Sequence, residues 1–303
     1  MGRESVTSAI QVRGLRRVFP RGWGRPAVVA VAEATFEIGA GEIVCLVGAA
    51  DAGKTTLLQL VAGVLRPTAG VVRIAGATVG SDTRRTIGFA PRDPAFPPGF
   101  TVREVLEYYA RAHAAGRERD AQVREALDAS GLSDRATRRA ARLPLADGRR
   151  LLLAQSLLGA RRIVALDEPF AGLDAVTRRD LCDRLQRLVV TGGSVLLSSA
   201  DPVGLERLAD RVLVLRAGRL VVDAPATSLL GGRVLEVVLD VPPLEAPPGF
   251  RVTATGLEAD LGGRSAESAL AVCRAHRLSV RASRVRLKTL DEATHDAAEV
   301  TPR

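Results

Sequence analysis

One stretch, residues 42–56, constrains the fold of this chain more than any other. It reads EIVCLVGAADAGKTT, which is an apolar run, a glycine-containing loop and the start of a helix. From Gly48 to Thr55 the loop carries the pattern G-x-x-x-x-G-K-[ST]. Such glycines let the backbone curl so that several N–H groups point at one anion, and the following helix N-terminus adds a favourable dipole. We therefore expect a strand–loop–helix unit that binds a nucleoside triphosphate.

The loop side chains have separate expected roles. Lys54 is expected to reach the β- and γ-phosphates, and Thr55 to place its hydroxyl on Mg²⁺. The nucleotide-binding residues predicted from this segment are Gly48, Asp51, Ala52, Gly53, Lys54, Thr55 and Thr56. The ligands expected here are ATP and Mg²⁺.

Composition narrows the class of protein. The 303 residues are enough for one large domain and one small one, and the 47% apolar content supports a sizeable core. The formal net charge of +9 is carried almost entirely by Arg, which is scattered through Ala/Leu/Val-rich segments with only 3% aromatic residues. Without clustering or aromatic interleaving, this charge indicates a solvated basic surface, and no nucleic-acid partner is expected.

Cysteines and hydropathy indicate where the chain works. Cys45, Cys182 and Cys273 are odd in number and far apart, so we expect buried free thiols and a reducing compartment. No apolar run approaches the roughly 20 residues needed to cross a bilayer, and residues 1–9 do not resemble a signal peptide. The chain is expected in the cytoplasm, attached to a membrane only through a partner.

The order of apolar runs predicts an α/β fold. Short runs expected as strands lie at 10–12, 28–36, 43–47, 71–74, 86–89, 163–166, 194–198, 211–215 and 220–223, and helices are expected at 57–65, 176–189 and 203–208. Between them, 101–156 has helical spacing and no strand pattern. This alternation predicts a mostly parallel core sheet, preceded by an antiparallel β subdomain and interrupted by a helical subdomain.

The pattern also predicts two domains. The first spans residues 9–226, with its helical subdomain at about 100–156, and the second spans 233–303. A proline-rich stretch at 241–249 lies near the start of the second domain. Strands expected at 234–238 and 278–285, with a helix at 266–277, predict a small α+β unit there.

A second motif bears on chemistry. Residues 162–169, RIVALDEP, form an apolar strand that ends in Asp167 and Glu168. Ligands gather at the carboxyl ends of parallel strands, where Gly48 is also expected. Asp167 is then expected to hold Mg²⁺, and Glu168 to act as the catalytic group that orients or deprotonates the attacking water. The competing interpretation is a helix-capping acidic pair, and Asp174 six residues on fits a simple helix cap.

With these motifs in this order, the chain resembles the ATP-binding cassette (ABC) family, specifically the ATPase subunits of ABC-2-type exporters. GAADAGKTT corresponds to Walker A, IVALDEP to Walker B and AGLD to the D-loop. The resemblance covers about residues 9–224 and implies that Phe19 stacks on adenine, although a core role for Phe19 fits equally well. It also implies that two such subunits dimerise head-to-tail, each site joining one chain's Walker motifs to the other's signature loop.

The signature loop departs from the family pattern. The family's Leu-Ser-Gly-Gly-Gln aligns with residues 143–147, LPLAD. Pro144 has neither a hydroxyl nor an N–H, Leu145 adds bulk, and Asp147 is expected to repel a phosphate.

Three further positions depart from the pattern. Arg92 stands at the Q-loop glutamine, Ala200 at the switch histidine and Asp51 at a position that is normally glycine. Loss of one preorganised donor typically costs about 10²–10³-fold in rate. Low intrinsic turnover of the isolated chain is therefore expected.

These motifs and departures bear on three functions. The first is an ATPase subunit of an ABC transporter, working through a separate membrane permease and paired with a second, non-identical ATPase subunit; export rests on the resemblance of the C-terminal segment KTLDEA to that of export ATPases. The second is a non-hydrolytic nucleotide-binding subunit that only supports dimer closure. The third, a soluble ABC protein of translation or DNA repair, is disfavoured because neither a second cassette nor a long coiled-coil insert is present.

Overall fold

The structure, a computed structural model, describes residues 8–20, 22, 26–80, 86–112, 114–159, 161–200, 205, 208–230 and 232–288. These residues form two compact units. Residues 8–200 and 208–223 make up the first unit, and residue 205 with residues from Ala224 onward makes up the second.

A ten-stranded sheet runs through the first unit in the order β5-β4-β1-β2-β10-β9-β3-β8-β7-β6. Its strands are β1 (Ser8–Phe19), β2 (Val28–Gly39), β3 (Ile43–Val47), β4 (Ala69–Ile74), β5 (Ala77–Thr78), β6 (Ile87–Ala90), β7 (Ile163–Leu166), β8 (Ser194–Ser199), β9 (Arg211–Arg216) and β10 (Arg219–Pro225). Strands β6, β7, β8, β3 and β9 are parallel neighbours, whereas β2, β1, β4 and β5 pair antiparallel. The predicted α/β class, with a parallel core and an antiparallel N-terminal part, is confirmed.

Strand β3 lies at the centre of the parallel part. All five of its residues are buried, as expected for a continuous apolar run covered on both faces. Its register sets Leu46 opposite Ser198 of β8, and β8 in turn sets Leu197 opposite Leu166 of β7. The carboxyl ends of these three strands therefore lie side by side at one edge of the sheet.

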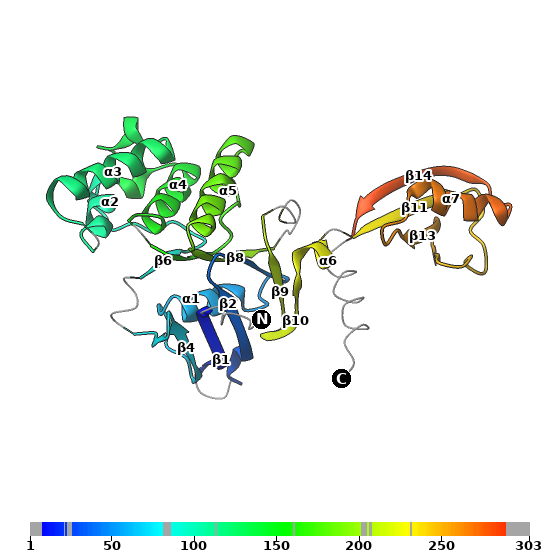
Figure 1. The fold of residues 1–303 in the computed structure, drawn as a ribbon, viewed down its shortest axis with the longest axis horizontal. Coiled ribbons are helices and arrows are strands. Elements are labelled where there is room, and N and C mark those ends of the chain that lie inside the picture. Colours follow the sequence, from blue (N-terminus) through cyan, green and yellow to red (C-terminus); the bar gives the residue numbers. More distant parts are fainter. Residues whose placement is uncertain are drawn as a thin grey trace, which may run out of the picture. The chain divides into compact units, whose positions relative to one another are not determined.

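The first unit also contains α-helices. They are α1 (Lys54–Val61), α2 (Val102–Ala110), α3 (Gly116–Ser130), α4 (Leu145–Ser156) and α5 (Ala175–Val190). Helix α1 contacts β2, β7 and β8, and α5 also contacts β8. Figure 1 shows α1 and α5 on opposite sides of β8, with α2, α3 and α4 grouped beside α5.

The helical subdomain has its own small core. Helices α2, α3 and α4 contact one another and bury a shared apolar cluster that includes Leu106, Leu127 and Leu151. Helix α2 begins with a capping box, in which the Thr101 side chain accepts from the Glu104 N–H at 3.2 Å and Glu104 accepts from the Thr101 N–H at 2.7 Å. The insert predicted from helical spacing is therefore present.

Two helix predictions differ from the structure. Helix α1 ends at Val61, before the predicted end at residue 65, because Gly63 adopts a left-handed φ of 69° and turns the chain away. The helix predicted at 203–208 falls mostly on residues outside those described.

The second unit contains a four-stranded antiparallel sheet in the order β12-β13-β11-β14. Its elements are α6 (Ala226–Leu230), β11 (Arg233–Leu239), β12 (Arg251–Thr253), β13 (Gly256–Asp260), α7 (Ala266–Ala275) and β14 (Val280–Leu287). Leu235, Val237, Leu257 and Cys273 form its apolar core with α7. Strand β12 and helix α6 were not predicted because their runs are short, and β13 was not predicted because its sequence GLEAD contains no β-branched or aromatic residue.

The three thiols differ in how deeply they are buried. Cys45 and Cys273 are buried, whereas Cys182 on α5 is only half-buried, and all three are free. Burial raises the pKa of the Cys45 thiol well above its usual range, so this group is an inert part of β3.

Candidate nucleotide-binding site

The loop between β3 and α1 has two glycines that no other residue can replace without a clash. A Cβ atom at Gly48 would lie 2.3 Å from the Leu215 carbonyl oxygen, and one at Gly53 would lie 2.2 Å from the Ala30 carbonyl oxygen. Gly53 also has a left-handed φ of 102° and precedes the first residue of α1. The loop is therefore held tightly against neighbouring backbone, with the α1 N-terminus directed into it.

Lys54 is buried beside this loop, with only 7% of its surface exposed. Its Nζ donates hydrogen bonds to the carbonyl oxygens of Gly48 (2.8 Å) and Ala49 (3.0 Å). The same atom lies 3.8 Å from Oε1 of Glu168. A buried ammonium with these partners fixes the path of the loop and joins it to the carboxyl end of β7.

Asp167 joins the loop to the sheet. Thr55 Oγ1 donates to Asp167 Oδ2 at 2.7 Å, and Ser198 Oγ donates to Asp167 Oδ1 at 2.6 Å. The Asp167 N–H donates to the Ala90 carbonyl oxygen at 2.9 Å, which connects it to the end of β6. With 2% exposure, Asp167 is buried, and each of its carboxylate oxygens accepts a hydroxyl hydrogen bond.

Glu168 is held by backbone and side-chain contacts. Its Oε2 accepts from the Ala200 N–H at 3.1 Å, and its own N–H donates to Ser198 Oγ at 2.8 Å. Its φ is 51°, a left-handed conformation that non-glycine residues rarely adopt. The structure therefore brings together Lys54, Thr55, Asp167 and Glu168, which the sequence placed in two motifs.

The donor set at Thr55 and Asp167 suits a hard divalent cation. Mg²⁺ takes oxygen ligands and is usually bound by one or two protein groups plus phosphate and water. A hydroxyl and a carboxylate 2.7 Å apart, at the end of a phosphate loop, are ligands of this kind. When bound, such an ion would offset negative charge on a triphosphate.

Asp51, Ala52 and Thr56 complete the loop side chains predicted to bind nucleotide. Asp51 is exposed and has a left-handed φ of 62°, at the position where glycine is usual in the family. Ala52 is buried, and its carbonyl oxygen accepts from the Gly218 N–H at 2.9 Å. Thr56 is half-buried on the first turn of α1.

Phe19 and Arg92 stand apart from this hydrogen-bonded group. Phe19 is the last residue of β1 and is half-buried, and the guanidinium of Arg17 lies 4.5 Å from its ring centroid. One face of the ring is therefore covered by a cation. Arg92 is exposed in the loop that follows β6.

Among residues 143–147, which align with the family's signature loop, Asp147 differs from the expectation. Pro144 precedes α4, and Leu145, the first residue of this helix, is 60% exposed. Asp147, by contrast, is buried: its carboxylate lies 3.3 Å from Arg135 Nε and 3.7 Å from Arg150 Nη1. The expectation that Asp147 faces and repels a phosphate needs correction, because two guanidinium groups of its own chain compensate its charge.

Arg150 extends this network to α5. Its Nη2 donates to Asp174 Oδ2 at 2.7 Å and to Thr177 Oγ1 at 2.8 Å. Asp174 also caps α5, since its Oδ1 accepts from the Thr177 N–H at 2.9 Å. The hydrogen bonds from Thr177 and then from Arg150 lower the pKa of Asp174 to about 2. Asp174 is thus both a helix cap and a link to α4.

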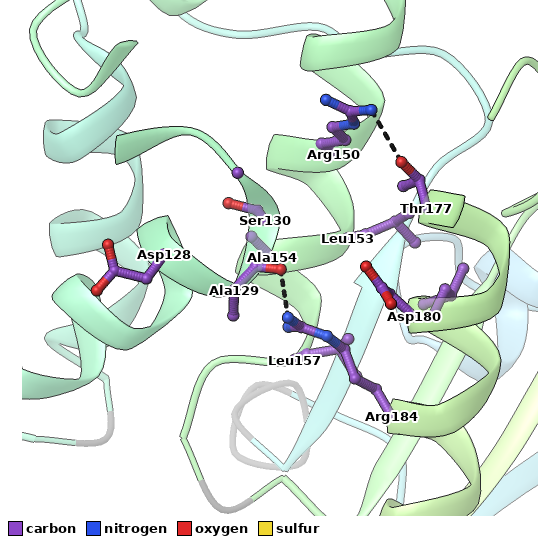
Figure 2. Close-up of a pocket in the computed structure, with 12 residues that line it drawn as sticks. Asp128, Ala129, Ser130, Arg150, Leu153, Ala154, Leu157, Thr177, Asp180 and Arg184 are labelled. Atoms are coloured by element: carbon purple, nitrogen blue, oxygen red, sulfur yellow. Dashed lines mark hydrogen bonds between the residues drawn. The ribbon is translucent and has the colours of Figure 1, made fainter. Parts of the chain in front are cut away.

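A pocket of about 290 Å³ lies between the end of α3 and helices α4 and α5 (Figure 2). Figure 2 shows Arg150 reaching across it to Thr177, and Arg184 donating to the carbonyl oxygen of Ala129. None of its lining residues belongs to the phosphate loop. These polar links hold the helical subdomain against α5.

A larger apolar groove, of about 970 Å³, lies between the helical subdomain and the end of the sheet. Aromatic side chains that line it are Phe89, Phe96, Phe100, Tyr108 and Tyr109. Pro91, also in its wall, directly follows Ala90, whose carbonyl oxygen accepts from the Asp167 N–H. One hydrogen bond therefore links the wall of this groove to Asp167 at the end of β7.

Comparisons with known proteins agree with this geometry. The family model described as ABC transporter matches residues 31–171. The Nod factor export ATP-binding protein I of Burkholderia thailandensis is 35% identical over 211 residues, which cover 67% of this chain and 69% of that protein. The protein of the same name from Rhizobium etli is 31% identical over 223 residues, covering 71% and 70%. This chain belongs to the ABC transporter family, as an ATP-binding subunit.

Solved structures show the fold of this ABC transporter subunit. A dimeric ATP-binding cassette in a post-hydrolysis state, bound to ADP and Pi, matches with a TM-score of 0.66 at 22% identity, covering 72% of this chain and 98% of that one. An ATP-binding subunit of an ABC transporter matches with a TM-score of 0.65 at 24% identity, covering 73% and 92%. The predicted P-loop fold is confirmed. Every helix in the described part of this ABC transporter subunit is too short or too polar to span a bilayer.

Proposed function

We propose that this chain couples ATP binding and hydrolysis to export through a separate membrane permease, as the degenerate half of a heterodimer with a second, non-identical ATPase subunit. The observation that carries the proposal is an imbalance within one chain. Hydrogen bonds and close contacts join Lys54, Thr55, Asp167 and Glu168. The start of α4, by contrast, has Pro144 and Leu145 where the family has groups that donate hydrogen bonds to a phosphate.

In this proposal the chain supplies the residues that bind Mg²⁺-ATP. Lys54 and the backbone of the loop bind the phosphates, and Thr55 and Asp167 hold Mg²⁺. Glu168 takes the proton of the attacking water or orients it, since its carboxylate is held between Lys54 and the Ala200 N–H. The hydrogen-bond donors to the phosphates that this chain lacks come from the partner's signature loop.

The second candidate is a non-hydrolytic subunit that binds nucleotide and supports closure only. The observation that favours it is at Ala200, which offers Glu168 a backbone N–H but has no side chain able to reach a γ-phosphate or its water. Asp51, whose backbone is left-handed, also places a negatively charged carboxylate in the loop that would bind the phosphates.

Export and membrane attachment rest on the relatives. Those named above are Nod factor export ATP-binding proteins, which supports export as the direction of transport. We assign the permease contact to the aromatic groove, because its wall at Pro91 directly follows Ala90, whose carbonyl oxygen accepts from the Asp167 N–H. The chain then lies peripherally, at the inner face of the membrane.

Dimerisation tests this proposal. The isolated chain carrying Glu168→Gln, saturated with Mg²⁺-ATP, is expected to stay monomeric, because two copies would meet through two degenerate signature loops. Size-exclusion chromatography with light scattering measures the mass, and nucleotide bound per chain is measured in the same sample. Addition of a cassette subunit with an intact signature is expected to give a 1:1 complex. An ATP-dependent homodimer of this chain would contradict the heterodimer.

A further inference from the structure

Ser198 carries a fully buried hydroxyl that directly follows three consecutive apolar residues of its strand. It is the fifth residue of β8, is 0% exposed, and lies opposite Leu46 of β3, one residue before the end of that strand. A buried hydroxyl is costly unless it is hydrogen-bonded. Its partners therefore show why it is tolerated at this place.

Those partners are the two acidic residues at the end of β7. Ser198 Oγ donates to Asp167 Oδ1 at 2.6 Å and accepts from the Glu168 N–H at 2.8 Å. A serine hydroxyl has one donor and two acceptor lone pairs, so its only proton is committed to Asp167. One hydroxyl thus bridges the carboxylate of one acidic residue and the backbone of the next.

One hydrogen bond of Ser198 fixes the orientation of the Asp167 carboxylate, and the other fixes the backbone conformation of Glu168. With Ser198 on Oδ1, the Asp167 carboxylate is oriented so that Oδ2 faces the Thr55 hydroxyl at 2.7 Å. The bond to the Glu168 N–H holds a backbone whose φ is 51°, and that conformation is retained only where the surroundings impose it. Both effects act through another residue.

We propose that Ser198 is a positioning residue of this site, which orients Asp167 toward the cation and holds Glu168 in its left-handed conformation. The proposal rests on the function proposed above. Groups that orient metal ligands typically account for about 10- to 100-fold in metal affinity, and this sets the size of the expected effect.

The chain offers a matched control on the same strand. Ser194, the first residue of β8, is also 0% exposed, and its hydroxyl donates to the Gly39 carbonyl oxygen at 2.7 Å. Ser194→Ala removes one buried hydroxyl bond from β8 at its other end. Ser198→Thr keeps the hydroxyl at the site and serves as the conservative variant.

The test measures ATP binding to the full chain by calorimetry, with Mg²⁺ and with EDTA, and thermal unfolding of each variant. Ser198→Ala is expected to raise the Mg²⁺ concentration for half-maximal enhancement of binding about 10- to 100-fold. Its affinity in EDTA and that of Ser194→Ala in either buffer are expected to stay within about threefold of wild type, and Ser198→Thr to restore the Mg²⁺ response.

The outcomes separate this inference from the proposed function. An unchanged Mg²⁺ response in Ser198→Ala, or an equal loss in Ser194→Ala, overturns the positioning role while wild-type binding stands. A wild-type chain that binds no ATP, or binds it without any Mg²⁺ response, instead contradicts the proposed function itself. If Ser198→Thr does not fold, the comparison of the two alanine variants decides alone.

Discussion

Replacing Lys54 with alanine is expected to lower the affinity of the isolated chain for Mg²⁺-ATP by about 100-fold or more. A hydrogen bond to a charged group contributes about 1.5–3 kcal/mol, and about 2.7 kcal/mol corresponds to 100-fold. Lys54 is buried at the base of the loop, where its ammonium is held by two loop carbonyls and lies 3.8 Å from Glu168. Calorimetric titration with Mg²⁺-ATP measures the change.

The chain's other lysine provides the control. Lys288 also has a largely covered side chain and pairs with Asp260 in the second unit. Lys288→Ala removes a lysine–carboxylate pair of the same kind and is expected to leave ATP affinity unchanged. Equal losses in both variants, or wild-type affinity in Lys54→Ala, would show that the loop at Gly48–Thr55 is not the nucleotide site.

Replacing Glu168 with glutamine is expected to lower ATP turnover of the assembled transporter by about 10²-fold or more, in keeping with the contribution of a general base. The amide keeps the shape of the side chain but cannot take a proton. Nucleotide affinity is expected to hold or rise slightly, since Gln removes a negative charge beside the phosphates. Steady-state phosphate release from the complex in detergent or lipid measures the effect.

This second result separates the two candidate functions. A non-hydrolytic subunit predicts unchanged turnover of the complex in Glu168→Gln, because all chemistry then belongs to the partner. Glu104→Gln is the matched control: it makes the same substitution in the capping box of α2, where an amide oxygen still accepts from Thr101. Its turnover is expected to equal that of wild type.

The parts of the fold and site that follow from the sequence are those set by local patterns. A continuous apolar run predicted β3, and the structure bounds that strand at Ile43 and Val47. The glycine spacing predicted a loop in which Gly48 and Gly53 tolerate no Cβ atom. In a chain whose basic residues are almost all Arg, a lysine at position 54 was itself a signal.

The parts that the sequence did not reveal depend on pairing between distant segments. Ser198 is 31 residues from Asp167, and only the neighbouring positions of β7 and β8 bring them together. The two serines at the end of an apolar strand were a usable signal, since buried hydroxyls need partners. Asp147 was misread for the same reason: its partner Arg135 lies on a separate turn, which local patterns do not place.

The charged face of the second unit also came only from the structure. Glu236 on β11 pairs with Arg284 and Arg286 on β14, and Glu258 on β13 pairs with Arg251 and Arg286. Three arginines of this unit are therefore paired with carboxylates of the same sheet.

The heterodimer proposal is tested most directly by single-turnover ATP hydrolysis by the isolated wild-type chain, with protein in excess over ATP and binding verified to be saturated. We expect tight Mg²⁺-ATP binding, with hydrolysis at least about 10²-fold slower than when a cassette subunit with an intact signature is added, since at least one preorganised donor must come from that partner. Hydrolysis by the isolated chain at the same rate as in the mixed complex would contradict it, because the degenerate loops would then be no handicap.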